Sequence, residues 1–125
     1  MAEGNNKGFE IDMTYLSDIA GGSEEFMIEM IDIFIEQTPL YFDQLSEAIA
    51  NQDWKSVGDV AHKIKPTLAF MGIEEAKDIM ADIERKARSD DNVSEIPGMF
   101  ANINARCEDL YDNLNKIKKE LEAKL

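Results

Sequence analysis

Histidine and cysteine are almost absent from this sequence. Its 125 residues include one histidine, His62, and one cysteine, Cys107. A single cysteine cannot form an intrachain disulfide, which permits a reducing compartment. A single histidine excludes a di-iron bundle site, which needs two Glu-x-x-His motifs, and also the usual zinc sites with several Cys and His ligands. We therefore expect neither of these two kinds of metal site in the chain.

Basic residues and long hydrophobic runs are also scarce. The 13 Lys and Arg residues face 26 Asp and Glu residues, which gives a net charge of −13. So acidic a surface repels nucleic acids and anionic lipids. Glu29 and Asp32 interrupt the longest apolar-rich stretch, residues 26–35, which cannot span a bilayer. The N-terminus has no basic region followed by an apolar run, as a secretory signal would. We expect a cytoplasmic protein that binds neither nucleic acid nor membrane.

Apolar residues recur at helical spacing along most of the chain, and no segment shows the period-2 alternation of a half-buried strand. We therefore predict an all-α fold, an up-and-down four-helix bundle with a short extra N-terminal helix. Residues 1–9 are predicted to form a flexible leader and residues 10–125 the bundle. The long helices are expected to begin near Ser23, Asp53, Glu74 and Ile96.

The first two long helices carry different signals. In the first, Phe26, Met30, Ile33, Phe34, Leu45 and Ile49 are predicted to face the core. Pro39 is expected to kink this helix or divide it near Thr38. In the second, the spacing of Trp54, Val57, Ala61, Ile64, Leu68 and Met71 predicts a continuous core-facing stripe that ends at Gly72.

The only histidine lies on the outward side of the helix that begins near Asp53. A helix advances about 100° per residue, so His62 points well away from the apolar stripe. Its neighbours one turn away are Gly58, Lys65 and Pro66, and Ala69 lies two turns on. These residues are small or cationic, which predicts room for a bulky partner to approach the imidazole.

This arrangement is compatible with phosphoryl chemistry. A neutral imidazole has a lone pair on one ring nitrogen and needs no general base to act as a nucleophile. Phosphoryl transfer then requires alignment and nearby positive charge. Lys65 is well placed to supply that charge, and Lys63 and Lys55 are weaker candidates. The residues alone equally allow His62 to be an ordinary surface histidine, with small neighbours that permit helix–helix contact.

Pro66 is unusual because it lies inside the same predicted helix. Proline there removes the N–H that would bond the His62 carbonyl, at a cost of about 3 kcal/mol. The apolar stripe continues on both sides, so we expect a bent but continuous helix. Such local strain tends to occur at functional sites. The alternative is that Pro66 begins a second helical segment, where proline costs little.

The segment Ala61-His62-Lys63-Ile64-Lys65, followed by Phe70-Met71-Gly72, resembles the histidine-containing phosphotransfer (HPt) domain. The motif of that family is Ala-His-x-Leu-Lys-Gly, followed several residues later by a hydrophobic residue and Gly. Residues 15–26 resemble the family's short helix and turn, and Asp53-Trp54 resembles the start of its histidine helix. Pro66 departs from the family's Gly, and Ile64 departs from its Leu.

The resemblance implies a phosphorelay intermediate of a two-component signalling system. His62 would be the phosphoacceptor, taking a phosphoryl group from the aspartate of a receiver domain, including that of a hybrid sensor histidine kinase, and passing it to another receiver. Lys65 would stabilise the phosphate charge. The supporting residues would be Lys63, Gly58, Pro66, Ala69 and Gly72.

The same resemblance implies that the receiver brings the Mg²⁺ and the catalytic aspartates. The chain itself would be a carrier without ATP-dependent kinase activity, and it has no Gly-rich phosphate loop. We expect a monomer.

Two other interpretations remain open at this level. The chain could be a helical adaptor or inhibitor that binds a receiver or kinase through the same face without phosphotransfer. Alternatively its function could depend on Cys107, although the position of this thiol on an apolar stripe predicts burial. Met13, Leu16 and Ile19, together with part of the long helix that begins near Ser23, could form an apolar docking patch near His62, or the three residues could simply cap the end of the bundle.

Overall fold

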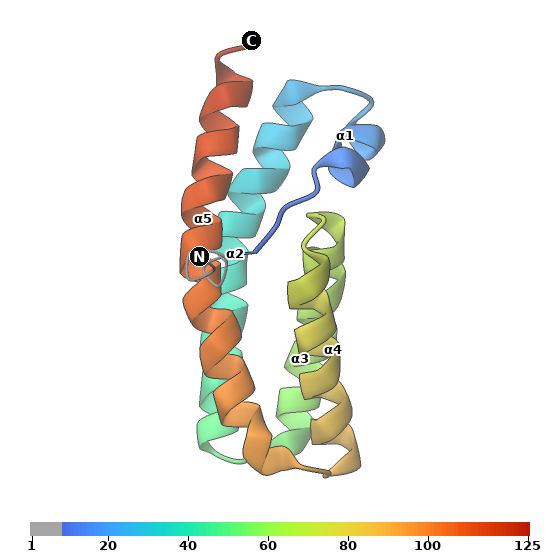
Figure 1. Cartoon of the computed structure of the whole chain (residues 1–125), viewed down its shortest axis with the longest axis vertical. Coiled ribbons are helices and arrows are strands. Elements are labelled where there is room, and N and C mark those ends of the chain that lie inside the picture. Colours follow the sequence, from blue (N-terminus) through green and yellow to red (C-terminus); the bar gives the residue numbers. More distant parts are fainter. Residues whose placement is uncertain (1–8) are drawn as a thin grey trace, which may run out of the picture.

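The computed structural model describes residues 9–125, which form five α-helices and a short 3-10 helix (Figure 1). The elements are α1 (Thr14–Ala20), α2 (Glu24–Ala50), α3 (Trp54–Phe70), α4 (Glu74–Ser89), η2 (Val93–Glu95) and α5 (Ile96–Glu122). The four long helices run alternately up and down, with α3 beside α4 and α2 beside α5. This confirms the all-α bundle with a short N-terminal helix.

Side-chain caps fix the starts of α2 and α3. The hydroxyl of Ser23 accepts a hydrogen bond from the backbone N–H of Phe26 at 3.2 Å, which caps α2 close to its predicted start. The carboxylate of Asp53 accepts one from the N–H of Ser56 at 3.3 Å and thereby caps α3. Gly21, with φ of 62°, ends α1 in the left-handed conformation.

The core-facing side of α2 differs from the predicted one. Phe34, Leu45 and Ile49 are buried as expected, but Ile33 is 48% exposed. Phe26 and Met30 are only partly buried, while Met27 and Ile31 occupy the core in their place. The reason is that α2 is apolar almost all round its first three turns, so helical spacing alone does not fix which side packs inward.

Both internal prolines lie within continuous helices. Pro39 is inside α2 and Pro66 is inside α3. The prediction that α2 divides near Thr38 is therefore wrong, as is the alternative that Pro66 begins a new segment. Phe34 and Phe42 are buried on either side of Pro39, so packing on both sides holds the helix together.

The N-terminal segment packs onto the bundle at the end of α3. The N–H of Asp12 donates to the carbonyl oxygen of Gly72 at 3.1 Å, and Leu16 is fully buried. Phe9 is buried as well, with the guanidinium of Arg106 4.0 Å from its ring centroid. Phe9 therefore does not belong to a flexible leader, and the rest of that predicted leader, residues 1–8, lies outside the described residues.

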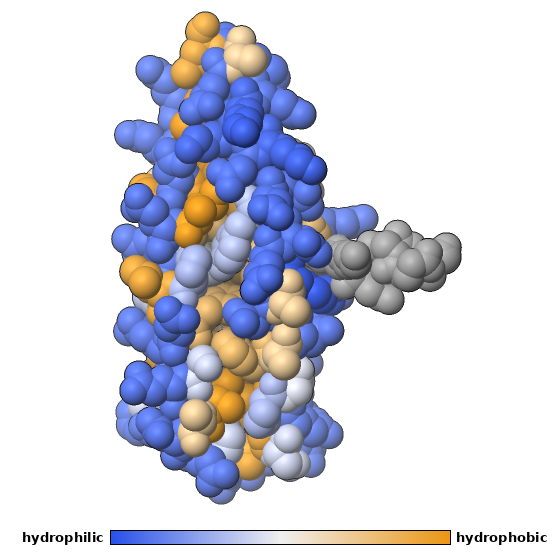
Figure 2. Space-filling view, turned by 90° about the vertical axis from the view of Figure 1, so that its left-hand side faces the viewer, coloured by the Kyte–Doolittle hydropathy of each residue, from blue (hydrophilic) through white to orange (hydrophobic). Residues whose placement is uncertain are grey.

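The surface on the α5 side is largely hydrophilic in its upper half, whereas apolar residues gather in its lower half (Figure 2). Within residues 9–125, no helix combines the length and the apolar character needed to cross a membrane.

Cys107 is buried in the core, and this burial raises the pKa of its thiol to about 12. The predicted burial of Cys107 is confirmed, which removes the basis for a function at this thiol.

Candidate functional site

His62 lies on the outward side of α3, with 64% of its side chain exposed. Its Nδ1 atom is 3.0 Å from Oε2 of Glu84, which projects from α4. An ionised carboxylate only accepts hydrogen bonds, so this contact assigns the ring proton to Nδ1. Nε2 then keeps its lone pair on a ring that is mostly open to solvent.

Glu84 also binds two cations. Nζ of Lys65 lies 2.6 Å from its Oε1 atom, and Nε of Arg88 lies 2.9 Å from Oε2. Only 12% of the Glu84 side chain is exposed. This burial raises the pKa of the carboxyl, but hydrogen bonds from Lys65, Arg88 and His62 outweigh it and bring the pKa down to about 2. Glu84 is therefore ionised throughout the neutral range and is the common partner of all three side chains.

The space beside Gly58 is filled by Arg88. The Arg88 guanidinium lies 3.4 Å from the Gly58 carbonyl oxygen and 3.2 Å from a carboxylate oxygen of Asp59. A Cβ atom on residue 58 would lie 3.0 Å from Cγ of Arg88. The prediction that Gly58 leaves open room beside His62 is therefore wrong, because its small size accommodates an arginine from α4.

The predicted lysines are placed differently from one another. Lys65 lies against Glu84, as described, and is not extended into solvent. Nζ of Lys55 lies 3.2 Å from a carboxylate oxygen of Asp59. Asp59 is one turn before His62, and Lys55 is two turns before it. Lys63 is exposed on the neighbouring side of α3. Of the three, Lys65 has the most direct connection to the imidazole, through their shared carboxylate.

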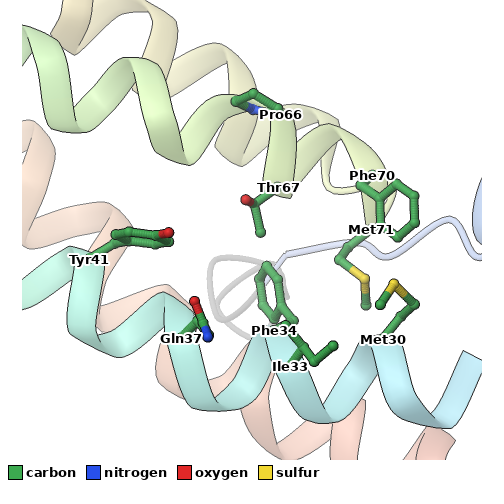
Figure 3. Close-up of a pocket in the computed structure, with 9 residues that line it drawn as sticks. All are labelled: Met30, Ile33, Phe34, Gln37, Tyr41, Pro66, Thr67, Phe70 and Met71. Carbon is green, nitrogen blue, oxygen red and sulfur yellow. The ribbon is translucent and has the colours of Figure 1, made fainter.

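Two hollows open beside the second half of α3. The first, about 340 Å³, lies between α2 and α3 and is lined chiefly by apolar side chains, including those of Ile33 and Phe34 (Figure 3). The second, about 530 Å³, lies between α3 and the N-terminal segment, where Tyr15 and Ala69 help to line it. Pro66 and Phe70 line both hollows.

The docking patch expected from Met13, Leu16, Ile19 and part of α2 forms only in its α2 part, where Ile33 and Phe34 line the first hollow. Leu16 is fully buried, and none of the three lines either hollow. The neighbouring Tyr15 is 55% exposed and contributes instead. The face of a helix of only seven residues is poorly defined by spacing, which explains the error.

Gly72 and Ala69, the last supporting residues predicted, lie at the second hollow. Gly72 has φ of 72°, and a Cβ atom there would collide with the carbonyl oxygen of Asp12. Its role in the described structure is therefore to let the N-terminal segment approach the end of α3.

Sequence reasoning missed Glu84 and Arg88. Glu84 is 22 residues away from His62 in the chain and belongs to another helix. The only local signal is the Glu–Arg pair at i, i+4 on α4, which is also common on ordinary solvated helix faces.

Comparisons with known proteins identify the family of this chain. Residues 29–123 match the Hpt domain, and the chain belongs to that family, whose members are phosphocarrier modules of two-component signalling. This confirms the resemblance seen around His62. The chain is also 22% identical over 117 residues to the phosphorelay intermediate protein rdeA of Dictyostelium discoideum. That alignment covers 94% of this chain but 46% of rdeA, so the chain spans about half the length of its curated relative. No solved structure gives a significant match.

Proposed function

We propose that this protein is a phosphorelay intermediate in which Nε2 of His62 accepts a phosphoryl group from a receiver-domain aspartate and passes it to another receiver. The observation that carries the proposal is the contact of Nδ1 with Glu84. It holds the imidazole in the tautomer whose nucleophilic nitrogen is Nε2 on an exposed ring. Membership of the Hpt family supports the same chemistry.

The proposed step conserves atoms and charge. The Nε2 lone pair attacks the phosphorus of the aspartyl phosphate, an N–P bond forms, and the P–O bond to the aspartate breaks. The receiver regains its carboxylate, and the imidazole becomes a phosphorylated imidazolium that keeps its proton on Nδ1. The ionised Glu84 carboxylate stabilises this positive ring. Transfer to a second receiver reverses the step.

The charge of the phosphoryl group needs cations, and Lys65 is the best placed to provide one. It is one turn from His62 on α3, and its ammonium already lies at the carboxylate that binds the imidazole. A change of side-chain rotamer would direct it to the phosphoryl oxygens. In this proposal the receiver supplies the Mg²⁺ and the catalytic aspartates, and this chain holds no cofactor and has no kinase activity of its own.

The partners in this proposal are receiver domains of response regulators and of a hybrid sensor histidine kinase. The two hollows beside α3 offer apolar surface that begins at Pro66, one turn from His62, where a docked receiver would bring its aspartate to Nε2. We expect the protein to act as a cytoplasmic monomer, without nucleic-acid or membrane partners.

The direct test is transfer of labelled phosphate from a phosphorylated receiver domain to the purified protein. The wild type should take up label in an acid-labile, base-stable form, as expected of a phosphoramidate, and the His62→Gln variant should take up none. Equal labelling of both proteins, or an acid-stable adduct, would overturn the assignment. Equal receiver affinity of both proteins with no transfer in either direction would favour the adaptor function instead.

The role of Lys65 has its own test. We expect Lys65→Ala to slow transfer by roughly tenfold, since one charge-stabilising group is removed while the nucleophile stays. Lys116→Ala is the matched control, because Lys116 is an exposed lysine on α5, which contributes no side chain to the site. Circular dichroism should show both variants folded. Equal transfer rates for the two variants would show that Lys65 is only a helix surface residue.

A further inference from the structure

We propose that Pro66 is a specificity-determining residue that selects which receiver domains dock beside His62. This inference rests on the proposed function, because it assumes that a receiver binds at the histidine side of α3. It concerns partner choice and not the chemistry of the imidazole.

The position of Pro66 carries the first part of the argument. It is exposed, lies one helical turn after His62, and is shared by the two hollows together with Phe70. In Figure 3, Pro66 lies at the rim of the first hollow, on the outward side of α3, whereas Thr67 points toward α2. Pro66 therefore forms part of a ridge that separates the two hollows, and a partner that fills both must straddle it.

The chemistry of proline gives this ridge two properties. The pyrrolidine ring is apolar and rigid, so it loses almost no side-chain entropy when it is covered. Proline also has no N–H, so the carbonyl of His62 lacks the donor that continuous helix α3 would otherwise provide.

These properties describe the receiver surface that fits. It carries apolar side chains that enter the hollows on both sides of the ridge. A receiver whose docking surface fits closely against a flat helix would collide with the proline ring. Selection therefore includes a repulsive element as well as an attractive one.

The experiment compares Pro66→Ala with Pro39→Ala. Both prolines lie inside long helices, and both variants regain a backbone N–H, but Pro39 lines neither hollow. Receiver domains encoded by the same organism are each phosphorylated with acetyl phosphate, and transfer is measured against receiver concentration. We expect Pro66→Ala to change the relative KM values of the receivers by about tenfold, with similar rates at saturation. Pro39→Ala should keep the wild-type order of preference.

A small donor separates docking from chemistry. Phosphoramidate needs no protein surface, so we expect it to label His62 at the same rate in wild type and in both proline variants. If Pro66→Ala lowered the labelling rate with phosphoramidate as much as the transfer rates with receivers, the proposal would be overturned, because Pro66 would then act on His62 itself. The same KM pattern in wild type and Pro66→Ala would also overturn it. If no receiver exchanged phosphate with the wild type, the proposed function would fail together with the inference.

Discussion

The residue with the most connections at this site is Glu84, and it is not on the histidine helix. His62 and Arg88 share its Oε2 atom, and Lys65 contacts Oε1. The orientation and tautomer of the imidazole are therefore set from α4. The position of the imidazole depends on how α3 and α4 pack, as well as on the residue itself.

We expect Glu84→Gln to weaken control of the imidazole. Glutamine can still accept a hydrogen bond, but it has no charge to hold Lys65 and Arg88 or to stabilise an imidazolium. Nitrogen-15 NMR with labelled histidine should show a smaller share of the Nδ1-protonated tautomer, and His62 gives the only signal because the sequence contains one histidine. Phosphotransfer should slow by roughly tenfold to a hundredfold.

The matched control for this variant is Glu75→Gln. Glu75 is also on α4 and also ion-paired, but its partner is Arg106 at 2.7 Å. The two variants differ in whether the lost charge faces His62. A tautomer ratio and a transfer rate that do not differ between them would contradict a positioning role for Glu84.

At this scale the sequence predicts the site only in part. His62 and Lys65 are recognisable because they share one helix, where spacing determines neighbours. Glu84 and Arg88 are not, because their contacts depend on the register between two helices. The packing of Arg88 over Gly58 could not be predicted either, because the presence of a glycine does not identify the side chain that packs against it.

At the scale of elements, the end of α3 is tied to the N-terminal segment. The N–H of Asp12 binds the Gly72 carbonyl, and the rings of Tyr15 and Phe70 meet edge-on with centroids 6.0 Å apart. These contacts build one wall of the second hollow. The shape of the surface near His62 therefore depends on a segment distant from it in the chain.

We expect Gly72→Ala to destabilise the fold by roughly 2 kcal/mol or more, because alanine disfavours positive φ and its Cβ would collide with the Asp12 carbonyl. Urea unfolding measures the change. Gly98→Ala is the control, since Gly98 lies in α5 and a Cβ there meets nothing within 4 Å. It should stabilise by about 0.5–1 kcal/mol. A neutral or stabilising Gly72→Ala would contradict the importance of this contact.

The sequence predicts the elements unevenly for a physical reason. In α3 the apolar residues form one stripe among polar ones, and Val57, Ala61, Ile64 and Leu68 are all buried as expected. In α2 apolar residues surround the helix, so tertiary packing chooses the face. The continuity of α2 through Pro39 likewise comes from packing, which outweighs the local preference of proline.

At the scale of the whole molecule, the net charge of −13 makes the placement of the few cations important. Lys55, Lys65 and Arg88 all form ion pairs around the histidine. This makes the site less negative than the rest of an acidic protein. It also links the stability of the bundle to the ionisation of Glu84.

We expect part of the acid sensitivity of the fold to come from Glu84. Its folded-state pKa, about 2, is below the ordinary 4.5, so its contribution is complete above pH 4.5 and is lost as the pH falls toward 2. The contribution is at most roughly 3 kcal/mol, reduced by solvent screening because Arg88 is partly exposed.

Urea unfolding at several pH values between 2 and 6 tests this prediction. The free energy of unfolding should fall more steeply with acid for the wild type than for Glu84→Gln. Carboxyls with a lowered pKa that share no partner with Glu84, such as that of Glu75, are present in both proteins and cancel in the difference. Parallel curves would contradict the assignment.

The ion pairs of Glu84 affect how long a phosphoryl group would remain on His62. A phosphoryl group on Nε2 would find Lys65 and Arg88 already bound to another anion. The two anions would compete for the same cations, and neither would be fully neutralised. We expect the N–P bond at such a site to be short-lived. The protein would then pass its phosphoryl group quickly to the next acceptor and would not accumulate in the phosphorylated form.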